Sequence, residues 1–345
     1  MIDLRSDTLT RPCSDMRQAI MDAEVNDDVI DVDPTVARLQ VKIADLLGKE
    51  AAMFMPSGTM TNQVAVRLHC RPGDEFLCEA GCHIYNYEQG AFAQLSGVAA
   101  RTFQGTNSSI DLSQLLNQVH PDNEHATRTR LLCLENTHNK GGGAVLPYDS
   151  VAETCQWARE SGLKTHLDGA RLFNAVVASK ISAKQWAQHF DTISICFSKG
   201  LGAPVGSALV GDESMIYQMR RHRKLFGGGM RQSGFLAAAA LFALENNIPR
   251  LAEDHQNAQE IAKIISQTEG LQLDVSKVET NIIVFGISPE LGTAAEFCEA
   301  AKAAGVWMFP FSHQDVRAVT HLHITSEDAI AAGETIAQVA RNLKK

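Results

Sequence analysis

LKTHLDGARLFNAVVAS, at residues 163–179, begins with an apolar run typical of a buried strand and continues into a helix-like segment. A second buried-strand run, TISICF, follows at residues 192–197. Two earlier runs of the same kind, EFLCEA and TRLLCLEN, occupy residues 75–80 and 129–136, again with helix-like segments between them. Strands that alternate with helices indicate βαβ units, so this part of the chain predicts an α/β fold with a mostly parallel sheet flanked by helices.

The C-terminal part of the chain has a different pattern. An Ala-rich helical stretch over residues 235–262 leads into the strand run TNIIVFGI at residues 280–287 and a helix near residues 293–304. The strand VRAVTHLHIT at residues 316–325 and a last helix from Ser326 complete it. This run of strands and helices lacks the glycine-rich loops of the preceding part, and it predicts a smaller α/β domain.

The N-terminal part contains a helix whose two ends can be read from the sequence. Asp33 is suited to the N-cap, Pro34 to the first helical position and Gly48 to the stop. No long linker interrupts the chain. We therefore predict a large domain over residues 1–245, which includes the N-terminal segment, and a small C-terminal domain over residues 246–345 packed against it.

The composition excludes several classes of protein. Among 345 residues, 31 are Lys or Arg and 40 are Asp or Glu, which gives a formal net charge of −9. That acidity argues against a nucleic-acid or anionic-membrane binder, because such binding needs an excess of cations. No apolar run approaches the ~20 residues of a membrane span, and the first residues, MIDLRSDTLT, do not form a signal peptide. We therefore expect a soluble, cytoplasmic protein.

The cysteines and the paired histidines do not indicate a metal site. Eight cysteines scattered through a chain without a secretory signal are expected to be free, buried thiols. Cys78, Cys82 and His83 lack the paired short spacing of a zinc site. His321 and His323 alternate along the predicted strand, and we expect them to share one of its faces without binding a metal.

Small and hydroxyl-bearing residues follow the strand run AAMFM at residues 51–55. Ser57, Gly58 and Thr59 open a predicted helix there. In a parallel α/β sheet ligands bind at the carboxyl ends of the strands, and the N–H groups of a helix start suit a phosphate. Taken alone, these residues favour the alternative interpretation, ordinary helix capping by Ser57 or Thr59.

Asp168 and Lys199 end the two strand runs with which this section began. A carboxylate at the buried end of a strand is costly unless it pairs with a cation, and an ion pair with Arg171 that caps the next helix is the alternative interpretation. Lys199 lies among glycines directly after a buried strand, which is the position of a desolvated amine nucleophile. A solvated lysine in a flexible loop fits those apolar flanks poorly.

A phosphate cradle, a buried carboxylate and a buried lysine are together what pyridoxal phosphate requires. Its phosphate must be held, its aldehyde must condense with a lysine, and its pyridine nitrogen must stay protonated beside a carboxylate. The run GGGMR at residues 227–231, with Lys224 just before it, adds a flexible basic loop suited to an anion.

Seven stretches of the chain together resemble the low-specificity L-threonine aldolases, pyridoxal-phosphate enzymes of fold type I, the aspartate aminotransferase-like superfamily. They are LRSDTLTRP (4–12), GKEAAMFMPSGTMTN (48–62), LENTHN (134–139), HLDGARLFNAVVAS (166–179), SKGLGAPVGSALVG (198–211), GGGMRQSG (227–234) and VRAVTHL (316–322). The resemblance implies a homotetramer that cleaves L-threonine or L-allo-threonine, which are β-hydroxy-α-amino acids, to glycine and acetaldehyde.

The resemblance also implies roles for individual residues. Lys199 would carry the cofactor as a Schiff base, Asp168 would pair with the pyridine nitrogen, and His83 would stack on the ring. His83 would also be the catalytic base, with His125, near the substrate hydroxyl, as the second choice. Further cofactor contacts are implied for Ser57, Gly58, Thr59 and Arg171, and for Lys224 and Arg231 of a neighbouring subunit; the substrate carboxylate contacts are Ser6, Arg171 and Arg317.

Two positions depart from the family's pattern. Where the family usually reads DDVYG[DE]DP, residues 27–34 read DDVIDVDP, so that Ile30 replaces a Tyr that faces the active site and Val32 replaces an acid. These changes bear on the preference between diastereomers and not on the class of reaction. Two alternatives remain: another pyridoxal-phosphate reaction, β-elimination or transamination, and a non-catalytic protein that binds the cofactor.

The residues Tyr85, Tyr87 and Glu88 follow His83 closely enough in sequence to line the same pocket. Packing is the favoured role for each of them, because no motif marks them as ligands.

Overall fold

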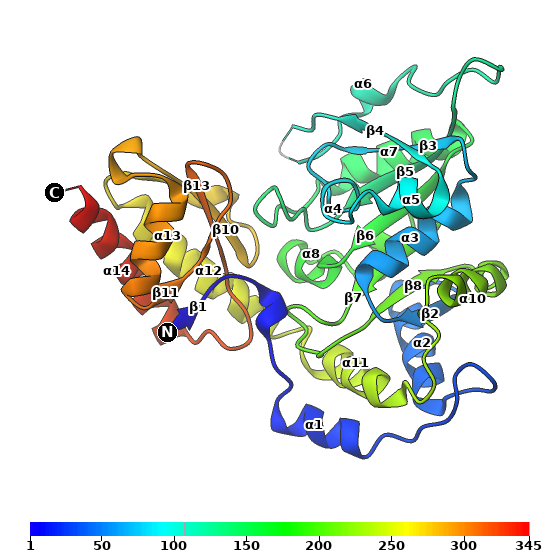
Figure 1. Ribbon diagram of the computed structural model, residues 1–345, viewed down its shortest axis with the longest axis horizontal. Helices are drawn as coiled ribbons and strands as arrows, with labels where there is room; N and C mark the ends of the chain where they lie inside the picture. The colour runs from blue at the N-terminus through cyan, green and yellow to red at the C-terminus, as the bar shows by residue number, and fades with distance from the viewer. Residues whose placement is uncertain (107, 345) are drawn as a thin grey trace.

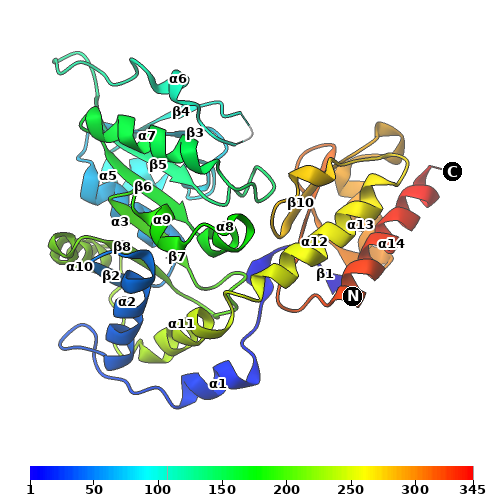
Figure 2. The ribbon, with the colours of Figure 1, turned by 180° about the vertical axis from the view of Figure 1, so that it is seen from behind.

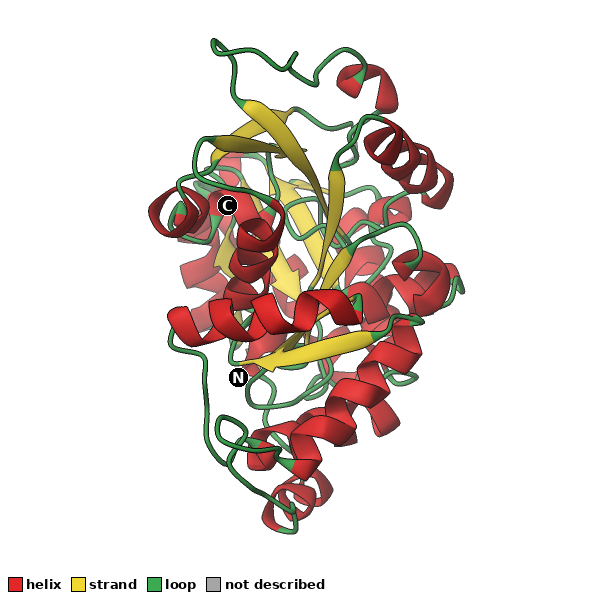
Figure 3. Cartoon of the chain, turned by 90° about the vertical axis from the view of Figure 1, so that its right-hand side faces the viewer, coloured by secondary structure: helices red, strands yellow, loops and turns green. Residues whose placement is uncertain are grey.

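A seven-stranded sheet forms the centre of the larger of two units in the computed structural model, which describes residues 1–106 and 108–344 (Figure 1). The strand order is β2-β8-β7-β6-β5-β3-β4, in which β8 runs antiparallel to β2 and β7 and the other neighbouring pairs are parallel. Helices cover both faces of this sheet (Figure 3), which confirms the predicted α/β fold. The strands are β2 (Ala51–Met55), β3 (Asp74–Glu79), β4 (Ala99–Phe103), β5 (Arg128–Glu135), β6 (Lys164–Gly169), β7 (Thr192–Cys196) and β8 (Ser207–Gly211).

The helix whose capping residues were predicted begins and ends as expected. In α2 (Pro34–Leu47), the Asp33 carboxylate accepts the N–H groups of Thr35 and Val36 at 3.0 and 3.1 Å, and Gly48 ends the helix at a φ of 61°. The other helices are α1 (Ser14–Met21), α3 (Gly58–His69), α4 (His83–Asn86), α5 (Ala91–Ser96), α6 (Leu112–Leu115), α7 (Tyr148–Glu160), α8 (Leu172–Ser179), α9 (Ala183–Ala187), α10 (Ile216–Leu225) and α11 (Gly234–Asn246).

A four-stranded antiparallel sheet and three helices form the C-terminal unit. Helix α12 packs beside α8 of the larger unit (Figure 2), so the two units are in contact. The sheet order is β12-β13-β10-β9. The elements are α12 (Leu251–Ser266), β9 (Leu271–Gln272), β10 (Ile282–Ile287), α13 (Ala294–Ala303), β11 (Val306–Trp307), β12 (Phe309–Pro310), β13 (Asp315–Val319) and α14 (Ser326–Leu343).

The N-terminal residues pack against the C-terminal unit, whereas the sequence assigns them to the large domain. Strand β1 (Ile2–Asp3) pairs in parallel with β11 (Figure 1). Leu4 is fully buried in the core of the C-terminal unit. A short 3₁₀ helix, η1 (Asp7–Leu9), then leads the chain back toward the larger unit. The N-terminal segment therefore crosses from one unit to the other.

Two predicted elements of the C-terminal part are wrong in detail. The helical stretch over residues 235–262 is two helices, α11 and α12, with Pro249 in the break between them. Strand β13 ends at Val319, because its partner β10 begins at Ile282 and the chain then turns. His321 and His323 therefore lie beyond the strand and do not share one of its faces.

All eight cysteines are free thiols, seven of them buried and Cys13 exposed, in agreement with the sequence. Among the described residues, no helix is long and apolar enough to span a membrane.

Candidate active site

Lys199 opens into a cavity of about 450 Å³ between the two units. It follows β7 by three residues, because that strand ends at Cys196, and the Thr10 hydroxyl donates to its backbone carbonyl at 3.0 Å. The cavity lies at the edge where β5, β6 and β7 end, as the rule for parallel sheets predicts. Its lining residues are Ser6, Thr8, His83, Tyr87, Asn139, Arg171, Lys199, Phe309, Pro310, Phe311 and Arg317.

Asp168 is a buried carboxylate on β6 with a full set of local donors. The Asn62 amide donates to its Oδ2 at 2.9 Å, and the backbone N–H of Ala170 donates to its Oδ1 at 3.1 Å. Burial by itself raises the pKa of Asp168, but the charges of His83 and Lys199 and the hydrogen bond from Asn62 together hold that pKa below its usual value. The carboxylate is therefore poised to remain ionised beside a cationic partner.

His83 and Glu88 form a hydrogen-bonded pair at this cavity. The distance from His83 Nδ1 to Glu88 Oε1 is 3.0 Å, and Glu88 is buried. Burial lowers the pKa of His83, but the hydrogen bond that it donates to Glu88 and the charge of Asp168 outweigh this effect, so the net shift is upward. Oxygen and nitrogen atoms of His83, Glu88 and Asp168 lie within 4.8 Å of one another. Glu88 therefore orients the imidazole and favours its protonated form, and its role is not the simple packing favoured from sequence.

The two arginines of the cavity have different partners. Arg171 forks onto Asp7, donating from Nε at 2.7 Å and from Nη2 at 2.8 Å, so the alternative ion pair with Asp168 is wrong. Asp7 is fully buried, and the charge of Arg171 lowers the pKa of its carboxyl even though burial opposes the shift. Arg317 donates to the neutral oxygens of Asn139 and Arg5 at 3.3 and 3.2 Å. Its Nε is buried and has no hydrogen-bond partner among the described residues.

Ser57, Gly58 and Thr59 stand at the start of α3, as predicted. The Ser57 hydroxyl accepts the N–H of Met60 at 3.2 Å, so capping is part of its role. Ser57 and Thr59 are nevertheless exposed at a helix N-terminus. Gly58 packs so closely on the end of β7 that a Cβ there would lie 2.6 Å from Cys196 Sγ. The helix start is therefore set directly beside the strand that leads to Lys199.

His125 does not reach this cavity within its own chain, so the role predicted for it stays a prediction. Its side chain is 86% exposed and lies 3.5 Å from Glu124. The loop that carries it precedes β5, whose first residue is Arg128, whereas the cavity lies at the opposite end of that strand, after Glu135. Eight strand residues span about 25 Å, so His125 lies at the end of the sheet opposite to the cavity.

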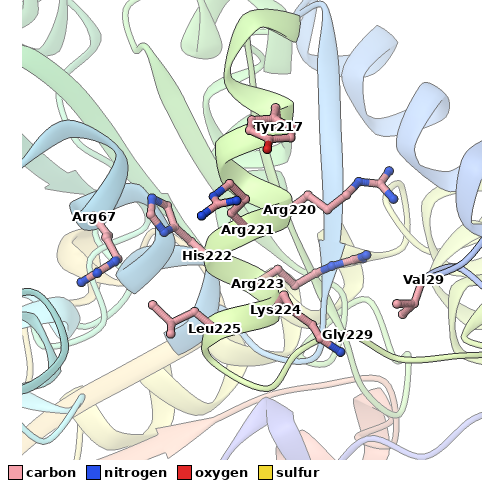
Figure 4. A pocket seen from close by; sticks show the side chains of 10 residues that line it. All are labelled: Val29, Arg67, Tyr217, Arg220, Arg221, His222, Arg223, Lys224, Leu225 and Gly229. Carbon is pink, nitrogen blue, oxygen red and sulfur yellow. The ribbon is translucent and has the colours of Figure 1, made fainter.

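Lys224 and Arg231 also lie outside the cavity of Lys199. Lys224 ends α10 beside Gly229, in a separate basic cavity of about 640 Å³ (Figure 4). Arg231 is exposed and forms an ion pair with Asp27 at 3.0 Å. Ile30 is 81% exposed, so this replacement for the family's tyrosine does not face the site of its own chain, and Val32 is exposed as well.

Asp7, Asn62, Glu88 and Asn139 belong to the site but were not predicted as ligands or partners. One local signal existed for Asn62, because it lies four residues after Gly58 and so on the same face of α3. Asp7 and Asn139 have no such signal, since their contacts with Arg171 span 164 and 32 residues.

The residues present fit pyridoxal phosphate. A primary amine, a buried carboxylate and an exposed helix N-terminus follow or end β7, β6 and β2, whose carboxyl ends lie at the same edge of the sheet. These are the groups that the aldehyde, ring nitrogen and phosphate of pyridoxal phosphate need. Arg317, whose Nε is buried and unpaired, supplies a further cation that lacks an anionic partner among the described residues.

Comparisons with known proteins show the family of this chain. The chain is 44% identical over 328 residues to the low specificity L-threonine aldolase of Escherichia coli K12, covering 95% of this chain and 96% of that protein. It is 40% identical over 333 residues to low-specificity L-threonine aldolase 1 of Arabidopsis thaliana, covering 95% and 93% of the two. The structure of Leishmania major threonine aldolase has the same fold, with a TM-score of 0.84 at 19% identity, over 99% of this chain and all of that one. Residues 3–288 match the family described as β-eliminating lyase, and the chain belongs to that family.

Proposed function

We propose that this protein is a pyridoxal-phosphate-dependent aldolase that cleaves L-threonine or L-allo-threonine to glycine and acetaldehyde. The observation that carries the proposal is the single cavity that Lys199, His83, Arg171 and Arg317 line, with Asp168 buried beside it. The near-full-length relatives named as L-threonine aldolases support the choice of substrate.

Each residue then has one task. Lys199 binds the cofactor aldehyde, Ser57, Gly58 and Thr59 hold its phosphate, and bound pyridoxal phosphate supplies a ring that accepts electrons from the substrate Cα. Asp168 keeps the ring nitrogen protonated. Arg317 and Arg171 hold the α-carboxylate, and Ser6 adds a contact at the cavity mouth. Guanidinium groups suit this task because they fix the plane of a carboxylate as well as its position.

His83 is the base that removes the β-hydroxyl proton, directly or through a water molecule. Loss of that proton lets the hydroxyl become the aldehyde carbonyl while the Cα–Cβ bond breaks. Glu88 accepts a hydrogen bond from Nδ1 of His83, which leaves Nε2 of His83 for the substrate. Because the pKa of His83 is raised, the neutral, basic form needs a pH above that raised value.

We also propose a homotetramer in the cytoplasm whose sites are shared between subunits, with neither a nucleic acid nor a membrane as partner. Lys224 and Arg231 are exposed cations that do not meet Lys199 within one chain. In the oligomer, both side chains would bind the phosphate of the cofactor held by a neighbouring subunit.

The deciding experiment supplies L-threonine and L-allo-threonine separately to the purified protein, with and without pyridoxal phosphate. We expect equal amounts of acetaldehyde and glycine, no product from Lys199→Ala, and normal turnover by Lys263→Ala, which removes an exposed lysine on α12. Ammonia with a keto acid would instead establish β-elimination, the reaction for which the matched family is named. Cofactor binding without turnover would establish a non-catalytic protein.

A further inference from the structure

A continuous line of polar side chains, buried except for the half-buried His69, runs from Asp168 along the face of the sheet that α3 covers to Thr192, the first residue of β7, and His69. Asn62 Oδ1 lies 3.1 Å from His166 Nε2, and His166 Nδ1 lies 3.0 Å from the Thr192 hydroxyl. The same hydroxyl lies 3.0 Å from His69 Nε2. Helix α3, which carries Asn62 and His69, packs across β6 and β7, which carry the other members (Figure 1).

The direction of every hydrogen in this line follows from its inner end. The Asn62 Nδ2 group lies 2.9 Å from Asp168 Oδ2 and 2.8 Å from Glu88 Oε1, and only an N–H group is stable between two carboxylates. Asn62 Oδ1 is therefore an acceptor, and His166 Nε2 must carry a hydrogen and donate it.

The outer half of the line is fixed in the same way. Burial lowers the pKa of His166 to about 4, so the ring is neutral and its Nδ1 can only accept. Thr192 then donates to His166, and its oxygen accepts from His69 Nε2. Every donor from His69 to Asn62 thus points toward Asp168, and such aligned hydrogen bonds polarise one another.

We propose that the chain His69–Thr192–His166–Asn62 keeps the proton shared by Asp168 and the cofactor on the pyridine nitrogen, by stabilising the Asp168 carboxylate. The inference rests on the proposed function, since it needs that cofactor. Without these donors the buried carboxylate becomes a stronger base, the proton moves from the nitrogen to Asp168, and the ring becomes a weaker electron acceptor. Asn62, His166, Thr192 and His69 are positioning residues for Asp168.

Thr192→Val tests this chain at its middle, because it removes one hydroxyl, keeps the branched shape and leaves Asn62 and Asp168 in place. The measurement is the ¹⁵N chemical shift of the ring nitrogen in holoenzyme loaded with labelled pyridoxal phosphate, calibrated with Asp168→Asn. We expect the ratio of protonated to neutral nitrogen to fall, by less than the about fivefold that one whole net hydrogen bond is worth, because Thr192 acts on Asp168 only through His166 and Asn62. Thr192→Ser keeps the hydroxyl and should restore the wild-type shift.

Thr165→Val is the matched control. Thr165 is an equally buried threonine on β6, and its hydroxyl donates hydrogen bonds to Asp191 and to the backbone carbonyl of His189. Neither residue belongs to the chain His69–Thr192–His166–Asn62, so loss of this hydroxyl should leave the nitrogen signal unchanged. His69→Leu is a second test at the half-buried outer end, where the fold tolerates change best, and it should move the signal in the same direction as Thr192→Val.

The outcomes separate this inference from the proposed function. If wild-type protein binds no pyridoxal phosphate, both fail. If the cofactor binds but Thr192→Val and His69→Leu give the same nitrogen signal as Thr165→Val, the proposed function stands. The role proposed for the hydrogen-bonded chain His69–Thr192–His166–Asn62 is then overturned.

Discussion

Replacing Asp7 by Asn tests whether one buried ion pair both joins the two units and prepares the site. Asp7 is fully buried and receives two hydrogen bonds from Arg171, at 2.7 and 2.8 Å, and a third from Asn281 of the C-terminal unit at 3.3 Å. Asn has nearly the same shape, so the substitution removes the charge without opening a cavity. A buried guanidinium left without its carboxylate costs about 3–5 kcal/mol.

Asp3→Asn is the control, because it makes the same change in the same segment. Asp3 also accepts two hydrogen bonds from one arginine, Arg5, at 2.9 and 2.7 Å, but the side chains of that pair are 22–30% exposed. Exposed pairs contribute about 0–1 kcal/mol. In urea unfolding at neutral pH we therefore expect Asp7→Asn to lose several times more free energy of unfolding than Asp3→Asn, and to raise KM for threonine.

Equal losses in the two variants would refute this reasoning, because burial would then not decide the strength of the pair. Adding Arg171→Met to Asp7→Asn should recover stability but not activity, since no unpaired charge is then buried. The pH dependence has a definite sign. The folded pKa of Asp7 is depressed, so its contribution is complete above its unfolded pKa of about 3.9 and is lost as the pH falls toward the folded value. The gap between wild type and Asp7→Asn should narrow in acid.

Glu88→Gln removes the hydrogen-bonded carboxylate that raises the pKa of His83, so the acid limb of the pH profile of kcat/KM should move to lower pH. An acid limb that stays in place or moves to higher pH would exclude His83 as the base. Gly58→Ala places a Cβ 2.6 Å from Cys196 Sγ, so it should weaken cofactor binding and cost about 1–3 kcal/mol of stability, and Cys196→Ala in the same chain should restore both. Lys199→Ala and Arg231→Ala, each inactive alone, should regain part of the activity when mixed into one oligomer, whereas an inactive mixture would show that the sites are not shared.

The parts of the candidate site whose position in the fold could be predicted are those with a local cause. Asp168 and Lys199 end or follow buried strands, and a run of apolar residues followed by glycine marks such an end without knowledge of the rest of the fold. Ser57 was recognisable for the same reason, because a helix start has its own sequence signal.

The parts that were missed depend on residues distant in sequence. Asp7 meets Arg171 only because β1 and Leu4 anchor the N-terminal segment to the C-terminal unit, and no local pattern records that crossing. His125 is a further case that no local pattern decides. Its role was carried over from a family motif, its loop adjoins the end of β5 opposite the cavity of its own chain, and the role therefore remains a prediction.

Arg171 and Arg317 divide the work of binding a carboxylate, and their partners show how. Asp7 occupies Nε and Nη2 of Arg171, so that this arginine offers only its remaining Nη1 edge to a ligand. Arg317 has no carboxylate partner among the described residues, and burial together with the charge of Arg171 lowers its pKa. A substrate carboxylate would compensate both the desolvation of Arg317 and its repulsion by Arg171. We therefore expect the binding energy to come mainly from Arg317, and Arg171, held in place by Asp7, to fix the orientation of the substrate carboxylate.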